Sequence, residues 1–449
     1  MTKKKLPVMP AQKRDEEAKR LAGLTVNPTM DLSELSSSIR DGLMAFCCNA
    51  GLLVVAEMME AELTELIGPK GAHNVERIAS RNGSASGSVI LGGRRAPIAR
   101  PRATRSEGGE LTLDSYAVFT NADLLSELAT ERMLAGVATR RHVLVQDPIG
   151  EELEQVAKGD SKSAISRRFV SATTKKVDEL LHRDLSGLDT AVLMIDGMIF
   201  EGTCVVVALL ILADGAKVPV GLWDGDTENT VVVRDLLADL VERGLRYETG
   251  ILCVIDGGKA LAAGIKRVFG RHALVQRCVL HKRRNISDYL PKDLGAITDR
   301  QLKVAFNDED AKRGLRVAKG IAKRLEADHP SAARSLREGL DEMFTLRRLG
   351  LPDLLCRSLN STNMIESMIG TCKVLSGRVK RWRDTKMVCR WVGAGLLEAE
   401  RSFRRIKGYK HMDLLVTAVR KEVAQRLVKE QEEITTTTDT PDNYDQAAA

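Results

Sequence analysis

The sequence has few aromatic residues, no paired-cysteine motif and no long apolar segment. Aromatics make up 4% of the 449 residues, which argues against a sugar-binding groove or an aromatic base-stacking platform. None of the eight cysteines belongs to a CxxC pair, and most lie in apolar runs, as is typical of reduced thiols in a cytosolic protein. The longest apolar run, Cys204–Ala213, is too short to span a bilayer, and residues 1–21 lack the apolar core of a secretory signal. We therefore expect a soluble cytoplasmic protein with no membrane partner.

Positive charge is concentrated in one part of the chain. The formal net charge is +7. Between Thr371 and Lys410, 12 basic residues accompany 3 acidic ones, whereas the remaining 56 basic and 58 acidic residues nearly cancel. This block, which includes Arg378, Lys380, Arg381 and Arg383, indicates a polyanion-binding surface, and a solvated helix face is the alternative.

Composition and periodicity divide the chain into seven segments. We predict a flexible arm (1–30), an N-terminal helical and β-hairpin region (31–125), a helix-turn-helix DNA-binding region (126–188), the first part of a catalytic core (189–291), an all-helical insertion (292–356), the second part of the core with basic C-terminal helices (357–431) and a disordered tail (432–449). The near-3.6 spacing of apolar residues predicts a helix over Leu32–Ile67.

The Gly/Ser/Arg-rich stretch after that helix carries two short strand signals, Ser88–Leu91 and Leu111–Tyr116. Between them, the basic run Arg94–Arg102 resembles an arm that can lie in a DNA minor groove. A solvated β-loop explains this run equally well.

A short helix over Ile149–Val156, a turn at Lys158–Ser161 and a second helix over Lys162–His182 have the spacing of a helix-turn-helix. The start of the second helix would present Ser161, Lys162, Ser163, Arg167 and Arg168 to DNA phosphates and base edges. A purely structural helix pair is the alternative.

Residues 190–290 predict an α/β core. Strands at Ala191–Ile195, Thr203–Leu212 and Val218–Trp223 follow one another through tight turns. They precede a helix (Asn229–Arg243), a strand (Ile251–Ile255), a helix (Lys259–Phe269), a strand (Ala273–Arg277) and a helix from about Cys278. An antiparallel meander followed by βαβ units is the element order of the RNase H-like fold, a mixed five-stranded sheet with helices. The region Arg378–Gln431 reads as helical throughout.

Two aspartates occupy equivalent positions in this pattern. Asp196 and Asp256 each follow four or five apolar residues and precede a glycine, as expected at the C-terminal end of a buried strand. A single such aspartate is usually a turn residue, but two on neighbouring strands favour a magnesium site, since Mg²⁺ prefers hard oxygen ligands. Two ions would need a third carboxylate. Glu366 is the candidate, on a helix capped by Ser361 or Thr362, although this spacing by itself is only a capping signature.

Four motifs together resemble the DDE transposases of bacterial insertion sequences of the Mutator type, over roughly Thr120–Met412. They are Met194–Gly197, Val254–Gly258, Gln276–Asn285 and Ser361–Ser367. The resemblance implies that Asp196, Asp256 and Glu366 form a catalytic triad holding two Mg²⁺ ions, with Mn²⁺ as a substitute. It also implies an all-helical insertion between the second and third members, although the tryptophan that family members often carry there is missing.

The third motif contains Cys278-x-x-His281. Two ligands at this spacing are half of a zinc site, and the sequence offers no companion pair. A His281 that donates to the scissile phosphate or orients DNA, and a purely structural histidine, are the other interpretations. The adjacent Lys282, Arg283 and Arg284 favour phosphate contacts.

The expected function is Mg²⁺-dependent cleavage at the ends of a mobile element, followed by attack of the 3′-hydroxyl on target DNA. The partners would be double-stranded DNA, as terminal inverted repeats and target, and further copies of the chain in a dimer or larger assembly, which the resemblance implies. The alternatives are an RNase H-like nuclease or resolvase without strand transfer, and a non-catalytic DNA-binding regulator.

Overall fold

The computed structural model describes residues 32–71, 78–149, 151–200, 202–225 and 229–438. The chain forms two compact units, residues 1–172 and 173–449. Their boundary falls inside helix α6 (Lys162–Leu181). The predicted arm (1–30) and the end of the predicted tail lie outside the described residues.

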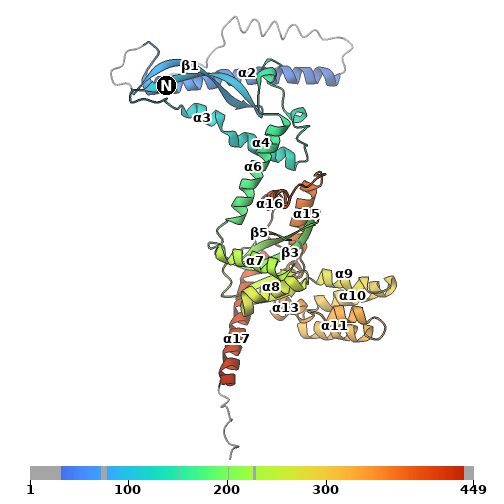
Figure 1. The fold of residues 1–449 in the computed structure, drawn as a ribbon. Helices are drawn as coiled ribbons and strands as arrows, with labels where there is room; N and C mark the ends of the chain where they lie inside the picture. The colour runs from blue at the N-terminus through green and yellow to red at the C-terminus, as the bar shows by residue number, and fades with distance from the viewer. Residues whose placement is uncertain (1–31, 72–77, 150, 201, 226–228, 439–449) are drawn as a thin grey trace, which may run out of the picture. The chain divides into compact units, whose positions relative to one another are not determined.

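The first unit is built on a long helix and a β-hairpin. Helix α2 (Leu32–Ile67) packs on β1 (Ala79–Leu91) and β2 (Arg94–Arg105), which pair antiparallel (Figure 1). The hairpin turns at Gly92 and Gly93, both with positive φ, as two-residue turns between antiparallel strands require. The predicted helix and the first strand are confirmed.

One prediction for the first unit is wrong, and one pair of alternatives is narrowed. Leu111–Tyr116 is not a strand, because helix α3 (Asp114–Thr120) begins within it and the Glu62 carboxylate accepts hydrogen bonds from the Asp114 and Ser115 amides. Of the two interpretations of Arg94–Arg102, the structure favours the β-loop, because this run forms most of β2. Arg94 is buried and paired with Glu154, and two further arginines of the run contact Glu110.

One stretch of α2, Arg40–Ile67, is long and apolar enough to cross a bilayer when judged by length and composition alone. One of its faces packs against the hairpin: Val55, Met59, Leu63 and Ile67 share a buried cluster with apolar residues of β1 and β2. Hairpin packing therefore accounts for one apolar face of the helix.

The unit continues through α4 (Ala122–Leu134), a 3₁₀ turn (Val143–Val145), α5 (Glu151–Val156) and α6. The helices of the predicted helix-turn-helix are present in α5 and α6, separated by a turn with Gly159 at φ +96°.

The second unit is centred on a five-stranded mixed sheet in the order β5-β4-β3-β6-β7. The strands are β3 (Thr190–Phe200), β4 (Thr203–Leu212), β5 (Lys217–Gly225), β6 (Ile251–Ile255) and β7 (Ala273–Arg277). The first three form an antiparallel meander, while β6 and β7 run parallel to β3. The α/β prediction is confirmed at this level.

Helices cover both faces of the sheet (Figure 1). Successive side chains of a strand point to opposite faces, and in these strands the side chains on both faces are mostly apolar, so both faces need to be covered. One face packs on α7 (Thr230–Glu242) and α8 (Lys259–Phe269). The other packs on α14 (Asp353–Leu359), α15 (Asn363–Ser376), α16 (Thr385–Arg401), α17 (Met412–Thr438) and the C-terminal part of α6. Residues Leu193 and Ile195 face the first layer, and Val192 and Met194 face the second.

The predicted insertion is helical and has its own core. It contains α10 (Lys292–Asn307), α11 (Ala311–Leu325), α12 (Pro330–Arg337), a 3₁₀ turn (Asp341–Phe344) and α13 (Thr345–Arg348). Phe306 and Phe344 pack together at its centre with 5.5 Å between ring centroids. Helix α9 (Val279–Asp288) contributes Ile286 to the same cluster.

Two C-terminal predictions need correction. The region from Arg378 is not helical throughout, because α15 ends before Gly377 and α16 begins only after Asp384, whose carboxylate accepts from the Met387 amide as an N-cap. The start of the predicted tail is helical, since α17 continues to Thr438.

Candidate active site

Asp196 projects from the middle strand of the sheet. In β3, Val192, Met194 and Met198 face the helical layer that includes α15, so the two-residue period points Asp196 toward the same layer. The strand does not end at Asp196 as predicted. Asp196 and Gly197 pair regularly with Val207 and Val206, and β3 continues to Phe200. The carboxylate is therefore fixed in a central ladder.

Asp256 directly follows β6, as predicted. Ile255 is in parallel register with Ile195, so Asp256 stands next to Asp196 on the neighbouring strand. Gly257 takes a φ of +119°, which lets the chain turn away, and the Asp256 carboxylate accepts a 2.8 Å hydrogen bond from the Gly258 amide. The turn orients this carboxylate.

Glu366 lies in the first turns of α15, which packs against β3. Thr362 occupies the N-cap position as predicted, but its hydroxyl does not cap the backbone. It donates a 2.6 Å hydrogen bond to Glu366 Oε1 instead. Thr362 therefore positions the third carboxylate, a role that the Thr-to-Glu spacing alone did not distinguish from capping.

The three carboxylates influence one another electrostatically. Asp196 is 8% exposed. Burial first, and then the charges of Asp256 and Glu366, raise the pKa of Asp196 to about 7, while His281 opposes the rise. Asp196 therefore senses the charges of Asp256 and Glu366 in a partly desolvated place, although 170 residues separate Asp196 from Glu366 in the sequence.

His281 lies on α9 beside this cluster, with Nδ1 3.8 Å from Glu366 Oε1 and 3.3 Å from Thr362 Oγ1. Hydrogen bonding with Cys278 raises the pKa of His281 to about 9. Burial alone would raise the pKa of the Cys278 thiol, but hydrogen bonds from His281 and Thr362 outweigh it and lower this pKa. The hydrogen bond between Cys278 and His281 thus lowers the pKa of the thiol and raises the pKa of the imidazole.

The three basic residues after His281 differ in their environments. Lys282 is buried, and Nζ donates to the carbonyls of Ser335 (2.6 Å) and Glu338 (3.0 Å), so it binds the insertion to α9 rather than a phosphate. Arg283 makes a two-pronged ion pair with Asp299. Arg284 is exposed. Of the three predicted phosphate ligands, Lys282 and Arg283 are engaged within the protein, and Arg284 is exposed and can contact a phosphate.

The predicted basic block contains a loop between α15 and α16, residues 377–384, which we call the basic loop. Its cations Arg378, Lys380, Arg381 and Arg383 are all exposed. Trp382 anchors the loop by packing edge-on against Phe200 at the end of β3, with ring centroids 5.8 Å apart. This anchor was not among the predicted functional residues, and its signal in the sequence is a single tryptophan within a basic stretch.

Four of the five predicted recognition residues, Ser161, Lys162, Ser163 and Arg167, are exposed at the start of α6. Arg168 is different. Its guanidinium donates to the Gly159 carbonyl within the preceding turn, and it is half-buried. Arg168 therefore supports the turn, while Arg167 is free to contact a ligand on the surface.

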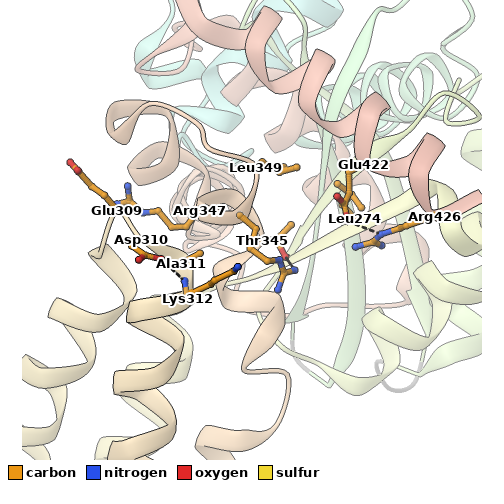
Figure 2. A pocket seen from close by; sticks show the side chains of 11 residues that line it. Leu274, Glu309, Asp310, Ala311, Lys312, Thr345, Arg347, Leu349, Glu422 and Arg426 are labelled. Atoms are coloured by element: carbon orange, nitrogen blue, oxygen red, sulfur yellow. Dashed lines mark hydrogen bonds and ion pairs between the residues drawn. The ribbon is translucent and has the colours of Figure 1, made fainter. Parts of the chain in front are cut away.

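A hollow of about 480 Å³ opens elsewhere in the second unit, between the start of α11, α13 and α17 (Figure 2). Its charged groups are largely satisfied within the protein: Arg347 pairs with Asp353 at 2.7 Å, and Glu422 pairs with Arg426 at 3.3 Å. None of its lining residues is a predicted site residue. The candidate active site is therefore the cluster of Asp196, Asp256 and Glu366 at the sheet, and not this hollow.

The donor set of the acidic cluster fits divalent cations. Three carboxylates supply hard oxygen ligands, and burial, followed by the neighbouring charge of Asp256, raises the pKa of Asp196. The fold and this cluster together define an α/β protein with acidic residues gathered at the middle of its sheet.

Comparison with known proteins gives the family. The model of the Mutator family of transposases matches residues 29–405, and the chain belongs to that family. Its relatives include the transposase of insertion sequence ISRM5 from Rhizobium meliloti, 26% identical over 80% of this chain and 89% of the relative. The transposase of IS6120 from Mycolicibacterium smegmatis is 27% identical over 53% and 73%. The transposase of IS905 from Lactococcus lactis is 25% identical over 70% and 78%. Such proteins in general bind, cut and transfer DNA.

Proposed function

We propose that this chain is a DDE transposase that cleaves DNA at the ends of an insertion sequence and transfers the cleaved strand, using Asp196, Asp256 and Glu366. The observation that carries the proposal is the placement of these three carboxylates: β3 and β6 are in parallel register next to the two aspartates, α15 packs on β3, and the charges of Asp256 and Glu366 raise the pKa of Asp196. A DNA-binding regulator has no use for such an arrangement, since it concentrates like charges in a buried place at a cost in stability.

The core is proposed to be RNase H-like. Support comes from the strand order, in which a three-stranded antiparallel meander places its first strand at the centre and the two later strands add in parallel on the other side. In this arrangement the middle strand and its parallel neighbour each contribute an aspartate.

Two magnesium ions, with manganese as a substitute, would be held by Asp196, Asp256 and Glu366, and when bound they supply activation of a water or 3′-hydroxyl and stabilisation of the leaving oxygen. The chain itself fixes the three carboxylates. The β3 ladder holds Asp196, the Gly258 amide orients Asp256, and the Thr362 hydroxyl orients Glu366.

His281 is proposed to act on DNA at the same site. Its raised pKa keeps the imidazole protonated at neutral pH, so it can donate a hydrogen bond to a phosphate oxygen next to the carboxylates. The exposed Arg284 lies three residues further along α9 and adds positive charge.

DNA contacts are proposed for two basic surfaces. The start of α6, as the recognition helix of a helix-turn-helix, would read the terminal inverted repeats through Ser161, Lys162, Ser163 and Arg167. The basic loop would hold phosphates without reading sequence, so this part of the binding weakens as salt rises. Because two ends have to be joined, the active form is proposed to be a dimer or larger assembly.

The central test uses Asp196→Asn, which keeps the size of the side chain but removes its charge. We expect cleavage and strand transfer of an end-containing duplex to be lost, while DNA binding stays nearly unchanged. Exposed Asp189→Asn is the matched control and should retain activity. Cleavage by Asp196→Asn at the wild-type rate would refute the proposed site, and cleavage without strand transfer by the wild type would indicate a nuclease.

The recognition proposal is tested by Arg167→Ala, with binding to terminal-repeat and unrelated duplexes compared at one salt concentration. We expect a loss confined to the terminal repeat, of about 1–3 kcal/mol for a base contact. An equal loss on both duplexes would assign Arg167 to phosphate. Unchanged affinity would remove α6 from recognition.

A further inference from the structure

A second type of donor set overlaps the carboxylate cluster. The ligand atoms of Cys278, His281 and Glu366 all lie within 4.8 Å of one another. His281 Nδ1 and Glu366 Oε1 are 3.8 Å apart. Bond lengths of 2.0–2.3 Å to a tetrahedral zinc ion place its ligand atoms about 3.3–3.8 Å from each other. Small side-chain movements would therefore close the trio on one ion.

The chemistry of the trio differs from that of the three carboxylates. A thiolate, an imidazole and one carboxylate are the ligand types that zinc prefers, whereas magnesium takes oxygen ligands and binds sulfur poorly. The structure therefore supplies the companion ligand that Cys278-x-x-His281 lacks in the sequence. Three protein ligands leave a fourth position for solvent or substrate.

The trio is held in place by the backbone around it. The Cys278 amide donates to the carbonyl of Ile255, the residue before Asp256, at 2.7 Å, and the Val279 amide donates to the Asn360 carbonyl at 3.0 Å. These bonds join the start of α9 to the end of β6 and to the segment leading into α15.

Thr362, which is fully buried, contacts all three ligands. Its amide lies 3.5 Å from Cys278 Sγ, and its hydroxyl is 2.6 Å from Glu366 Oε1 and 3.3 Å from His281 Nδ1. Such supporting contacts orient metal ligands before the metal arrives.

We propose that Cys278, His281 and Glu366 form a zinc-binding site, and that zinc bound there inhibits the enzyme by withdrawing Glu366 from the magnesium ligands. The zinc site stands on the geometry alone. The inhibition rests on the proposed function, because it requires Glu366 to be a catalytic ligand. A zinc ion held by Cys278, His281 and Glu366 would turn the Glu366 carboxylate toward α9 and away from Asp196 and Asp256, so the two metals would compete for this side chain.

Binding is tested on the full, metal-free chain by titration with Cd²⁺, whose thiolate complexes absorb in the ultraviolet, and with Co²⁺, whose visible spectrum reports tetrahedral coordination. We expect one equivalent to bind with a sulfur-to-metal band. In Cys278→Ser the band should disappear and Zn²⁺ affinity should fall by about 100-fold, at the upper end of the loss caused by changes around metal sites. His281→Ala, which alters a half-exposed side chain, should weaken binding to a similar extent.

Exposed Cys47→Ser is the matched control and should keep the full band. A band and affinity unchanged in both Cys278→Ser and His281→Ala would overturn the zinc site. If the Cys278→Ser chain does not fold, the His281→Ala variant and the cobalt spectrum of the wild type decide the question. A cobalt spectrum without tetrahedral, sulfur-bound character would also overturn the zinc site.

Inhibition is measured as the ratio of Mg²⁺-dependent cleavage with and without zinc. We expect zinc to inhibit the wild type and a zinc-selective chelator to reverse this, whereas the ratio in Cys278→Ser should approach one. Asp196→Asn separates the two proposals. It should still bind cadmium, because Asp196 is not in the trio, so cleavage by this variant would refute the proposed function and leave the zinc site standing. Zinc that binds without inhibiting would refute the competition.

Discussion

Replacing Asp196 by asparagine should stabilise the metal-free protein at alkaline pH. In the folded chain the Asp196 carboxyl keeps its proton up to about pH 7, whereas in the unfolded chain it ionises near 3.8. The folded state therefore loses stability progressively as pH rises from about 4 to about 7, and the loss is constant above that range. An asparagine does not titrate, so the variant lacks this loss.

The size of the effect follows from the shift. A change from 3.8 to about 7 corresponds to about 4 kcal/mol at pH 8, of which about 2–3 kcal/mol develops between pH 5 and pH 8. Urea unfolding in the presence of a chelator, followed by circular dichroism at both pH values, measures it. The difference in unfolding free energy between Asp196→Asn and wild type should grow by that amount.

Two controls make the experiment decisive. Exposed Asp189→Asn, which also removes one carboxylate but lies outside the cluster, is the matched control variant. Adding Mg²⁺ at pH 8 should stabilise the wild type, by about 2.7 kcal/mol at 100 times its dissociation constant, and Asp196→Asn much less. If both proteins lose stability equally between pH 5 and pH 8, Asp196 does not carry the desolvated charge inferred here.

Three further predictions concern the surroundings of the site. Trp382→Ala should release the basic loop from Phe200 and weaken DNA binding at low salt by at most about 10-fold, measured by fluorescence anisotropy; a larger loss would mean that Trp382 itself contacts DNA. Arg284→Ala should reduce the salt dependence of DNA binding by about one counterion, whereas Lys282→Ala should lower thermal stability and leave that slope unchanged; the reverse pattern would contradict their assignments. Phe344→Ala should cost about 3–5 kcal/mol in the core of the insertion, seen as earlier loss of protection in hydrogen exchange there, and a cost below 1 kcal/mol would show a poorly packed core.

The sheet was predictable because its strands carry strong local signals. Ile251–Ile255 is a continuous apolar run between a glycine and an aspartate, Ala273–Arg277 begins with a shorter apolar run, and the structure reproduces both predicted ranges. The convergence of Asp196 and Asp256 followed from neighbouring strands in parallel register. The partnership with Glu366 depended on the family resemblance, since no local pattern specifies which helix returns to the sheet.

Other features depended on partners far away in the sequence. Lys282 looks like a phosphate ligand beside Arg283 and Arg284, but two carbonyl groups more than 50 residues later bind its ammonium. Asp196-Gly197 looks like the end of a strand, yet the pairing with β4 carries the strand through it. The composition of residues 378–384 suggests a helix, but these residues form a loop. Asp384 caps the start of the next helix, and Trp382 packs on Phe200, so both contacts hold the segment in its loop conformation.

The continuity of β3 past Asp196 limits how this protein can adjust to its substrate. A side chain at a frayed strand end can follow a moving ligand. The backbone of Asp196 and of the residues on either side of it pairs with β4, and Ile195 also pairs with β6, so the Asp196 backbone cannot shift unless the sheet opens. Accommodation then falls to the segments around it, α9 and the basic loop, and to the DNA. Under the proposed function, a duplex that bends or unpairs readily at the element's end would be cleaved faster than a stiff one of equal affinity.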